Sequence, residues 1–302
     1  MSELKNILVI RLSSLGDVVM TIPAVNAIHE RFPDTHISWL VEGSVGEFLK
    51  AQDFISEVII FRRNAFSKAV RNGNFLEAIR IFGSCIRELR QRKYDTIIDF
   101  HGIAKSTLFA MFVHTNERIG FGKMFAKEKS HLFYDVNVNG TDKRMHKVER
   151  NMLMAHHLGS TAPICLPHLR VSTEAEVYIK DFLTGMNEET SFLAVNPFSS
   201  KGTDFKRWPI EKYGELILKI FRERGTRSVI LWGPGEEKEA RRLKEISGQS
   251  AFLACPTNIS QLYALLKKSS LYIGGDTGVM HLAAAAGTRV LSLFGPTDHR
   301  IN

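Results

Sequence analysis

The sequence predicts an α/β protein with two doubly wound, Rossmann-like domains, each built on a parallel sheet. Short β-branched and apolar runs alternate with helical patterns along the chain, as in parallel α/β proteins. The length of 302 residues is comfortable for two domains of ordinary size. Two prolines in the stretch 161–168 separate two series of elements. Because prolines stop helices, this stretch is typical of a linker.

The first series of elements predicts a domain over residues 1–165, and the second predicts a domain over residues 166–302. In the first domain we expect strands at 7–11, 37–41, 58–61, 96–99 and 118–121, and helices at 17–31, 75–92, 105–112 and 145–158. In the second we expect strands at 192–196, 228–232, 251–253, 271–273 and 290–294, and helices at 210–223, 236–246, 259–268 and 277–286. Ligands of open parallel sheets bind beyond the carboxyl ends of the strands. The expected site is therefore the cleft between the two domains.

Composition places the chain among soluble globular proteins, with 44% hydrophobic and 24% charged residues. No apolar run approaches the roughly 18 residues of a membrane span. A short polar lead precedes the first strand, so we expect no signal peptide and a cytoplasmic location. The three cysteines lack metal-ligand spacing and cannot form a disulfide framework, and we expect all three to be buried apolar groups.

Most of the net charge of +8 lies between residues 62 and 93, where nine Lys and Arg face only two Glu. Apolar residues recur there at helical spacing, so one helix face is expected to pack while the other carries the charge; they are Phe75, Ile79, Phe82, Ile86 and Leu89. The stretch is either a solvated basic helix or a patch for a polyanionic partner such as an anionic lipid surface or a phosphorylated glycolipid. No nucleic-acid module is recognisable, and we do not expect nucleic acid as a partner.

The most informative segment is 273–287, where a strand meets a glycine-rich turn and an alanine-rich helix. The first amides of such a helix, with the positive end of its dipole, form an anion site. Asp276 has the residue type of an N-cap, and Gly274, Gly275 and Gly278 would let a ligand approach the backbone. The simpler alternative is an ordinary βα turn closed by a capping Asp.

A second candidate follows the first strand, at residues 11–24. The segment lacks the GxGxxG pattern of dinucleotide folds, but Gly16 permits a tight turn and Asp17 projects at the carboxyl edge of the sheet. Asp17 is either a first-turn residue favoured by the helix dipole or a general base that takes a proton from a hydroxyl nucleophile.

Two segments of the second half also carry candidates. Lys206 stands just before a predicted helix and suits a phosphate oxygen, although a surface lysine would look the same. Glu236 and Glu237 follow a strand, where an acidic residue can bind ribose hydroxyls or simply begin a helix.

Together these motifs resemble glycosyltransferase family 9, the ADP-heptose:lipopolysaccharide heptosyltransferases. The matching segments occur in the right order over nearly the whole chain, at 13–24, 206–209, 231–237 and, most specifically, 274–298. Residues 101–106 and 146–151 are similar to secondary signatures of the family. Family members usually continue for several tens of residues beyond the position of Asn302, so we expect a short second domain here.

The resemblance implies a GT-B fold and inverting transfer of heptose from ADP-heptose to the lipopolysaccharide inner core. It gives Asp17 the role of general base. The donor-binding residues that it implies are Ser199, Lys206, Glu236, Glu237, Asp276, Thr277, Gly278 and His281. The acceptor-binding residues that it implies are Ser14, Arg62, Arg63 and Lys105. The implied acceptor is a lipid-linked, anionic core oligosaccharide (Kdo-lipid A or a heptosyl acceptor), met by peripheral contact with the inner membrane face.

An inverting displacement needs a base on one side of the anomeric carbon and charge stabilisation of the leaving diphosphate on the other. Asp17 lies in the first predicted domain, and Lys206 and the helix after Thr277 lie in the second. Because no paired acidic motif accompanies them, we expect no metal ion and no other cofactor. Two alternatives stay open: a GT-B protein using another nucleotide sugar, and a non-catalytic protein that binds anionic glycolipid.

Overall fold

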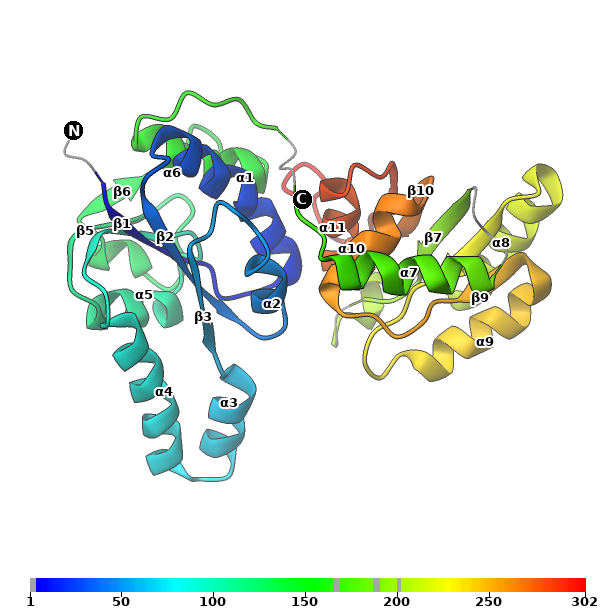
Figure 1. The fold of residues 1–302 in the computed structure, drawn as a ribbon, viewed down its shortest axis with the longest axis horizontal. Coiled ribbons are helices and arrows are strands. Elements are labelled where there is room, and N and C mark those ends of the chain that lie inside the picture. The colour runs from blue at the N-terminus through cyan, green and yellow to red at the C-terminus, as the bar shows by residue number, and fades with distance from the viewer. Residues whose placement is uncertain (1–3, 166–168, 187–190, 200–201) are drawn as a thin grey trace. The chain divides into compact units, whose positions relative to one another are not determined.

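The computed structural model describes residues 4–165, 169–186, 191–199 and 202–302 of the chain (Figure 1). It divides into two compact units, the first of residues 1–168 with Ile301 and the second of residues 169–300 with Asn302. Residues 161–165 of the predicted linker form no helix or strand, and residues 166–168 lie outside the described part. No helix in the described ranges is long and apolar enough to cross a membrane.

Unit 1 contains a parallel six-stranded sheet in the order β3-β2-β1-β4-β5-β6. Its strands are β1 (Asn6–Ile10), β2 (His36–Glu42), β3 (Glu57–Phe61), β4 (Tyr94–Asp99), β5 (Thr115–Phe121) and β6 (Val136–Val138). Its helices are α1 (Leu15–Arg31), α2 (Val45–Leu49), α3 (Arg63–Arg71), α4 (Phe75–Leu89), α5 (Ala104–Phe112) and α6 (Lys147–His157), with a 3-10 turn, η1 (Ser130–Phe133).

The central strand of unit 1 is buried on both faces, as an all-parallel sheet requires. Leu8 and Ile10 of β1 belong to a core shared with α4 and α5, and strand alternation turns Val9 to the other face. Val9 pairs in register with Trp39 of β2 and with Ile98 of β4. The continuous apolar run in the sequence is therefore explained by burial from both sides.

Unit 2 contains a parallel five-stranded sheet in the order β11-β10-β7-β8-β9. Its strands are β7 (Phe192–Asn196), β8 (Arg227–Ile230), β9 (Ala251–Leu253), β10 (Leu271–Gly275) and β11 (Val290–Leu293). Its helices are α7 (Thr173–Gly185), α8 (Ile210–Arg224), α9 (Glu237–Ser247), α10 (Ile259–Lys268) and α11 (Gly278–Ala285), with 3-10 turns η2 (Asp204–Lys206) and η3 (Gly248–Ser250).

Both sheets are doubly wound, as the sequence predicts, and each has one topological switch point. In unit 1 the chain leaves β1 toward β2 and later returns on the other side as β4. In unit 2 the same reversal lies between β7 and β10. Because the crossover connections of a parallel sheet are right-handed, the helices on the two sides of this reversal lie on opposite faces of the sheet. A crevice then forms beyond the carboxyl ends of the two central strands. The loops after β1, β4, β7 and β10 are therefore the positions at which each unit can bind a ligand.

Three expectations from the sequence are wrong in detail. The basic stretch forms two helices, α3 and α4, and the predicted apolar face of the second packs only in part. Ile86 and Leu89 are buried in the core, but Phe75 and Ile79 are 63% and 67% exposed, because the first turns of α4 have no sheet residue against them. Of the three cysteines, Cys85 is buried as expected, whereas Cys255 is only half-buried and Cys165 is exposed.

The third correction concerns the glycines of the turn after β10. A side chain at Gly274 would meet the Tyr272 hydroxyl and lie 2.8 Å from the carbonyl oxygen of Asn196. Gly274 is therefore required by packing inside unit 2 rather than by a ligand. At Gly275 the nearest atom would be 3.9 Å away, an ordinary contact, so the space in front of this residue is open.

We predict that Gly274→Ala destabilises the protein by about 1–3 kcal/mol, the usual cost of forcing a methyl group into a packed interior. Gly275→Ala is the matched control and is expected to leave stability within about 0.5 kcal/mol of the parent. Urea unfolding of the three proteins measures the difference. Equal midpoints for the two variants would contradict the packing role of Gly274.

Candidate active site

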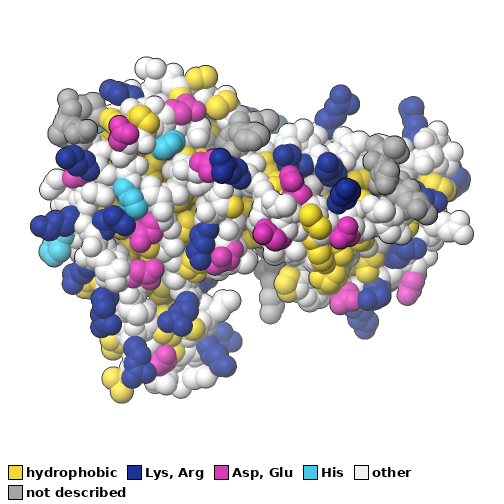
Figure 2. Space-filling model, in the orientation of Figure 1, with side chains coloured by type: hydrophobic (Ala, Val, Ile, Leu, Met, Phe, Trp, Pro, Cys, Tyr) yellow, Lys and Arg dark blue, Asp and Glu magenta, His cyan; other side chains and the backbone are white. Residues whose placement is uncertain are grey.

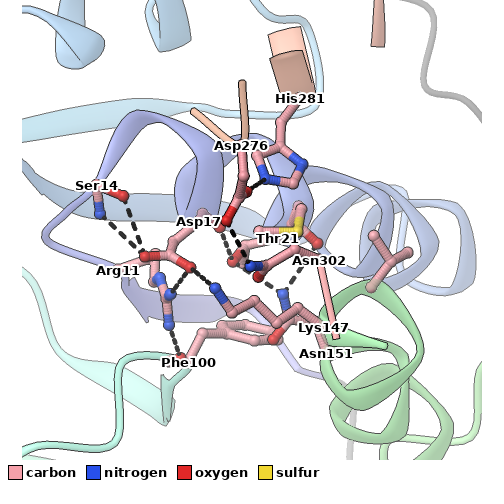
Figure 3. A network of polar contacts seen from close by, with 12 residues as sticks. Arg11, Ser14, Asp17, Thr21, Phe100, Lys147, Asn151, Asp276, His281 and Asn302 are labelled. Atoms are coloured by element: carbon pink, nitrogen blue, oxygen red, sulfur yellow. Dashed lines mark hydrogen bonds and ion pairs between the residues drawn. The ribbon is translucent and has the colours of Figure 1, made fainter. Parts of the chain in front are cut away.

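The carboxylate of Asp17 is held at the start of α1, at the switch point of unit 1 (Figure 3). Ser14 is the N-cap residue of this helix, and its hydroxyl donates to Asp17 Oδ2 at 3.1 Å. The Ser14 amide donates to the same oxygen at 3.4 Å. Asp17 thus also occupies the first turn of a helix, where the dipole favours negative charge. Asp17 is therefore a first-turn residue favoured by the helix dipole, as one of the two hypotheses for it states, but it also makes contacts that this role does not require.

Two cations also contact Asp17. Arg11 Nη2 and Lys147 Nζ each lie 3.0 Å from Oδ1 of this carboxylate. Burial raises the pKa of Asp17, but Arg11 and Lys147 together outweigh it and hold the pKa well below its usual range. The carboxylate therefore stays ionised at every physiological pH and can accept a hydrogen bond from a hydroxyl group.

Asp17 lines a cavity of about 150 Å³ that lies wholly within unit 1. The polar lining combines this carboxylate with four cationic side chains, Arg11, Lys127, Lys147 and Arg150. The remaining lining residues are Phe100, His101, Ile103, Phe121, Phe125 and Asn151. A small polar cavity with such a surplus of positive charge suits an anionic ligand.

Helix α6 brings two of these groups to the cavity. The Asn151 amide donates to the carbonyl of Met20 at 2.9 Å and to the Thr21 hydroxyl at 3.1 Å, which fixes α6 to α1. One residue earlier, the Arg150 guanidinium lies 4.6 Å from the centre of the Phe125 ring. Its Nε is buried without a hydrogen-bond partner. A buried donor without a partner is costly, and an anion in the cavity would satisfy it.

The cavity wall is stiffened by a buried network at the end of β4. Asp99 accepts hydrogen bonds from the Tyr134 hydroxyl at 2.7 Å and from the His101 amide at 2.8 Å. The Arg11 guanidinium donates to the carbonyl of Phe100. His101 Nδ1 accepts from the amide of Leu12 at 3.2 Å. Burial, with a smaller contribution from the cation of Arg11, lowers the pKa of His101 to about 3, so this imidazole is neutral beside the cationic groups.

Two of the predicted acceptor-binding residues share one carboxylate. Arg63 lies 3.4 Å from Glu42, and Lys105 forms an ion pair with the other oxygen of the same buried side chain. Glu42 ends β2, so both cations are fixed at the carboxyl edge of the sheet. Arg62 is exposed and forms the N-cap of α3 at the same edge. The structure gives Arg63 and Lys105 a structural partner in addition to any acceptor.

In unit 2 the candidate residues gather after β10 (Figure 3). Asp276 is buried and lies 4.0 Å from Lys206 Nζ and 3.8 Å from His281 Nε2. Asn302 donates to Oδ2 of the same carboxylate at 3.1 Å. Lys206 stands before α8, as predicted, and is the last residue of the 3-10 turn η2. The lysine, the acid and the histidine thus form one cluster within unit 2.

Helix α11 begins one residue later than the sequence suggests. Its N-cap is Thr277, not Asp276, and its first residue is Gly278. The amide of Asn196, the last residue of β7, donates to the Thr277 hydroxyl at 3.4 Å and to Tyr272 at 3.3 Å. These hydrogen bonds connect the ends of the two central strands, β7 and β10, at the switch point. Because Thr277 is the N-cap, the Asp276 carboxylate does not cap α11.

The remaining donor candidates make local contacts. Glu236 accepts from the Gly233 amide at 2.7 Å, and burial raises its pKa. Glu237 is the first residue of α9 and pairs with Arg241 at 2.5 Å. Ser199 donates to the carbonyl of Thr203 at 3.0 Å. The alternative that these two glutamates simply begin a helix therefore fits the structure, and the ligand roles of all three residues stay predictions.

The cations that surround Asp17 were not predicted from the sequence. Arg11 ends the first strand, and Lys147 and Arg150 lie in the segment 146–151, which was singled out only as a secondary signature. The contacts that hold Arg11 and Lys147 join residues about 90 to 130 positions apart in the chain, namely Arg11 with Phe100 and Lys147 with Asp17. The pairing of Arg11 with Asp17 could have been predicted from the sequence, because both residues belong to one βα turn and a largely buried arginine requires a nearby carboxylate.

Comparisons with known proteins identify the family of the chain. The model of glycosyltransferase family 9 (heptosyltransferase) matches residues 82–301. Lipopolysaccharide heptosyltransferase 1 of Escherichia coli O18:K1:H7 is 29% identical over 97% of this chain and 86% of its own length. The crystal structure of a family 9 glycosyltransferase from Veillonella parvula superposes with a TM-score of 0.79 at 21% identity, covering 99% of this chain and 83% of that one. The E. coli heptosyltransferase WaaC, solved with ADP-2-deoxy-2-fluoro heptose, gives a TM-score of 0.77 at 25% identity, covering 97% and 90%. The expected GT-B fold is thereby confirmed.

We predict that His101 makes the protein acid-sensitive. Its folded pKa is about 3, below the roughly 6.5 of an unfolded histidine, so below pH 6.5 the unfolded chain takes up a proton that the folded chain does not. This contribution to stability is complete above pH 6.5 and shrinks by about 2 kcal/mol on going to pH 5. His101→Asn, whose amide oxygen can accept from Leu12, should lose this pH dependence. Urea unfolding of both proteins at pH 7.5 and pH 5 measures it, and parallel changes in the two proteins would refute it.

Proposed function

Because the chain belongs to glycosyltransferase family 9, we propose that it transfers heptose from ADP-heptose to the inner core of lipopolysaccharide with inversion at the anomeric carbon. The relatives named above are heptosyltransferases, and one was solved with an ADP-heptose analogue. The observation that carries the proposal is the ionised Asp17, held by two cations at the edge of a cationic cavity. A carboxylate in that setting suits a hydroxyl nucleophile that belongs to an anionic acceptor.

We propose that the cavity of unit 1 binds the acidic part of the acceptor. A carboxylate or phosphate there would pair with Lys127 and with Arg150, whose Nε has no hydrogen-bond partner. The acceptor hydroxyl would then lie against Asp17, with Ser14 beside it. Arg62, Arg63 and Lys105, at the same sheet edge, would contact further anionic groups of the acceptor.

We propose that the switch point of unit 2 binds the donor. Lys206 and the first amides of α11 suit the diphosphate, because both present positive charge. A carboxylate would repel phosphate, so Asp276 is better suited to accept hydrogen bonds from the hydroxyls of the sugar, with His281 beside it. Of the two glutamates proposed for the ribose, Glu237 is the better candidate, because the Glu236 side chain folds back onto Gly233. Ser199 accepts a hydrogen bond from Arg207 at 3.1 Å, and Arg207 also pairs with Glu239 of α9, the helix that begins at Glu237, so we assign Ser199 to the same donor site.

In the proposed reaction the acceptor oxygen forms a bond to the anomeric carbon while the bond from that carbon to ADP breaks. The hydroxyl proton goes to Asp17, and the electron pair of the broken bond goes to the diphosphate oxygen, which Lys206 stabilises. Because the pKa of Asp17 is held low, it is a weak base. Proton transfer is therefore expected late, after the bond to ADP has largely broken and the acceptor oxygen has become acidic.

We propose that the reaction uses no metal ion or other cofactor, since Lys206 and a helix N-terminus can stabilise the leaving group. A lipid-linked acceptor would bring the enzyme to the cytoplasmic face of the inner membrane by peripheral contact.

Asp17→Asn tests the proposal directly. The amide fills the same space but cannot take the proton, so turnover should fall by roughly 10²–10⁴-fold. Release of ADP from ADP-heptose in the presence of Kdo-lipid A gives the rate, and calorimetry gives the affinity for ADP, which should be unchanged. Asp34→Asn, an exposed carboxylate elsewhere in unit 1, is the control. Full turnover by Asp17→Asn would refute the base assignment.

Lys206→Met tests the leaving-group assignment. Loss of a charged hydrogen bond to phosphate should lower turnover and affinity for ADP by about tenfold or more, while Lys212→Met, which removes an exposed lysine of α8, should change neither. The unaltered enzyme should keep its activity in excess EDTA. A strict requirement for a divalent metal would show that the diphosphate is stabilised in another way.

The choice of nucleotide separates heptose transfer from the use of another nucleotide sugar. We expect ADP to raise the melting temperature more than UDP or GDP at equal concentration, since only a bound ligand stabilises the folded state. Preferential stabilisation by UDP would remove ADP-heptose as the donor. A shift with ADP but no turnover with any acceptor would favour the non-catalytic, glycolipid-binding alternative.

A further inference from the structure

Helices α3 and α4 form a hairpin that leaves unit 1 beyond the end of β3 (Figure 1). We call residues 68–80, around the connection of the two helices, the hairpin tip. Four large apolar side chains of this tip are exposed, with exposed fractions between 41% and 81%; they are Val70, Phe75, Leu76 and Ile79. Single exposed apolar residues are common on protein surfaces, but a cluster at one projecting end marks a binding surface.

The same helix shows that this exposure follows from position. Farther along α4, Ile81, Cys85 and Ile86 pack into the core of unit 1. The first turns of α4 extend past the sheet and have α3 as their neighbour, which leaves Phe75, Leu76 and Ile79 exposed (Figure 1). Burial within unit 1 therefore accounts for only the second half of the apolar stripe that the sequence displays.

The charge of the hairpin tip is strongly positive. Lys68, Arg71 and Arg80 are exposed, and the single acidic residue, Glu77, is already paired with Arg80 at 2.7 Å. Figure 2 shows the Lys and Arg side chains beside hydrophobic ones over α3 and α4. Exposed apolar groups flanked by basic ones are the pattern of a segment that lies in the interface of an anionic bilayer. A second copy of this chain is a poorer occupant, because two such tips would repel each other.

We infer that the hairpin tip docks on an anionic membrane surface, with Phe75, Leu76 and Ile79 entering the interface and Lys68 and Arg71 contacting lipid phosphates. The inference rests on the lipid-linked acceptor of the proposed function. It also fits the placement of the hairpin, whose first residue, Arg63, is tied to Glu42 at the carboxyl edge of the sheet. Docking through the tip would thus bring the bilayer to the edge that carries the acceptor candidates.

The test measures binding of the full chain to vesicles that contain neither donor nor acceptor. Phosphatidylglycerol–phosphatidylethanolamine vesicles are compared with phosphatidylcholine vesicles by co-sedimentation. The anionic vesicles should bind the protein at least about tenfold more strongly, and the difference should shrink at high salt. Phe75→Ser/Leu76→Ser should lower binding to the anionic vesicles by about tenfold or more. Ile164→Ser/Val177→Ser, which removes two exposed apolar side chains outside the hairpin, is the matched control and should bind normally.

Two further readouts keep the outcome clear. In Leu76→Trp, the emission of the new tryptophan should shift to shorter wavelength on addition of anionic vesicles, which reports entry of this position into the interface. Turnover of a deacylated, water-soluble acceptor by Phe75→Ser/Leu76→Ser should match that of the parent, because neither side chain belongs to the proposed site. Unchanged vesicle binding by the double variant, or no emission shift in Leu76→Trp, would overturn the inference. Failure of heptose transfer with normal vesicle binding would instead count against the proposed function alone.

Discussion

The structure of unit 1 depends on the pairing of the Asp17 carboxylate with Arg11 and Lys147. The side chain of Arg11, directly after the central strand, is only 12% exposed, and an uncompensated charge there would be strongly destabilising. Asp17 supplies the compensation, and Asp99 adds to it from the next strand. The same pairing keeps Asp17 ionised, fixes its orientation and brings α6 to the cavity through Lys147. The electrostatic requirement of Arg11 thus sets the charge and the orientation of the neighbouring carboxylate.

The two units have comparable carboxylate–lysine pairs at comparable positions of their sheets. Each has a parallel sheet with one reversal of strand order, and each presents a carboxylate close to a lysine just beyond the central strands. Asp17 lies 3.0 Å from Lys147 in unit 1, and Asp276 lies 4.0 Å from Lys206 in unit 2. Glu42 and Lys105 form a third such pair at the edge of the first sheet. In each pair the carboxylate fixes the position of the lysine.

The exposed apolar side chains of α4 are not part of the candidate active site. Most apolar residues of the chain are buried between one of the two sheets and its helices. Helix α4 is an exception, because only part of its apolar stripe is buried. Its second half packs on the sheet and its first half does not. Exposed apolar side chains lower solubility, and under the proposed function the hairpin tip and the cationic cavity would both serve an amphipathic, anionic acceptor.

The sequence by itself determined the two parallel α/β units, because strand and helix patterns are local and alternate along the whole chain. It also determined the βα turns that carry Asp17 and Asp276, since polar residues after an apolar strand fall at the carboxyl edge of the sheet. It placed Lys206 before α8, but not in the 3-10 turn that it occupies. Only the tertiary structure decided which groups meet there. Lys147 and Asn151 reach α1 from more than a hundred residues away, and Thr277, which is linked to Asn196, is the N-cap of α11 in place of Asp276. The exposure of Phe75 was likewise beyond the sequence, because helical spacing shows which side of a helix is apolar and not how far the sheet beneath it extends.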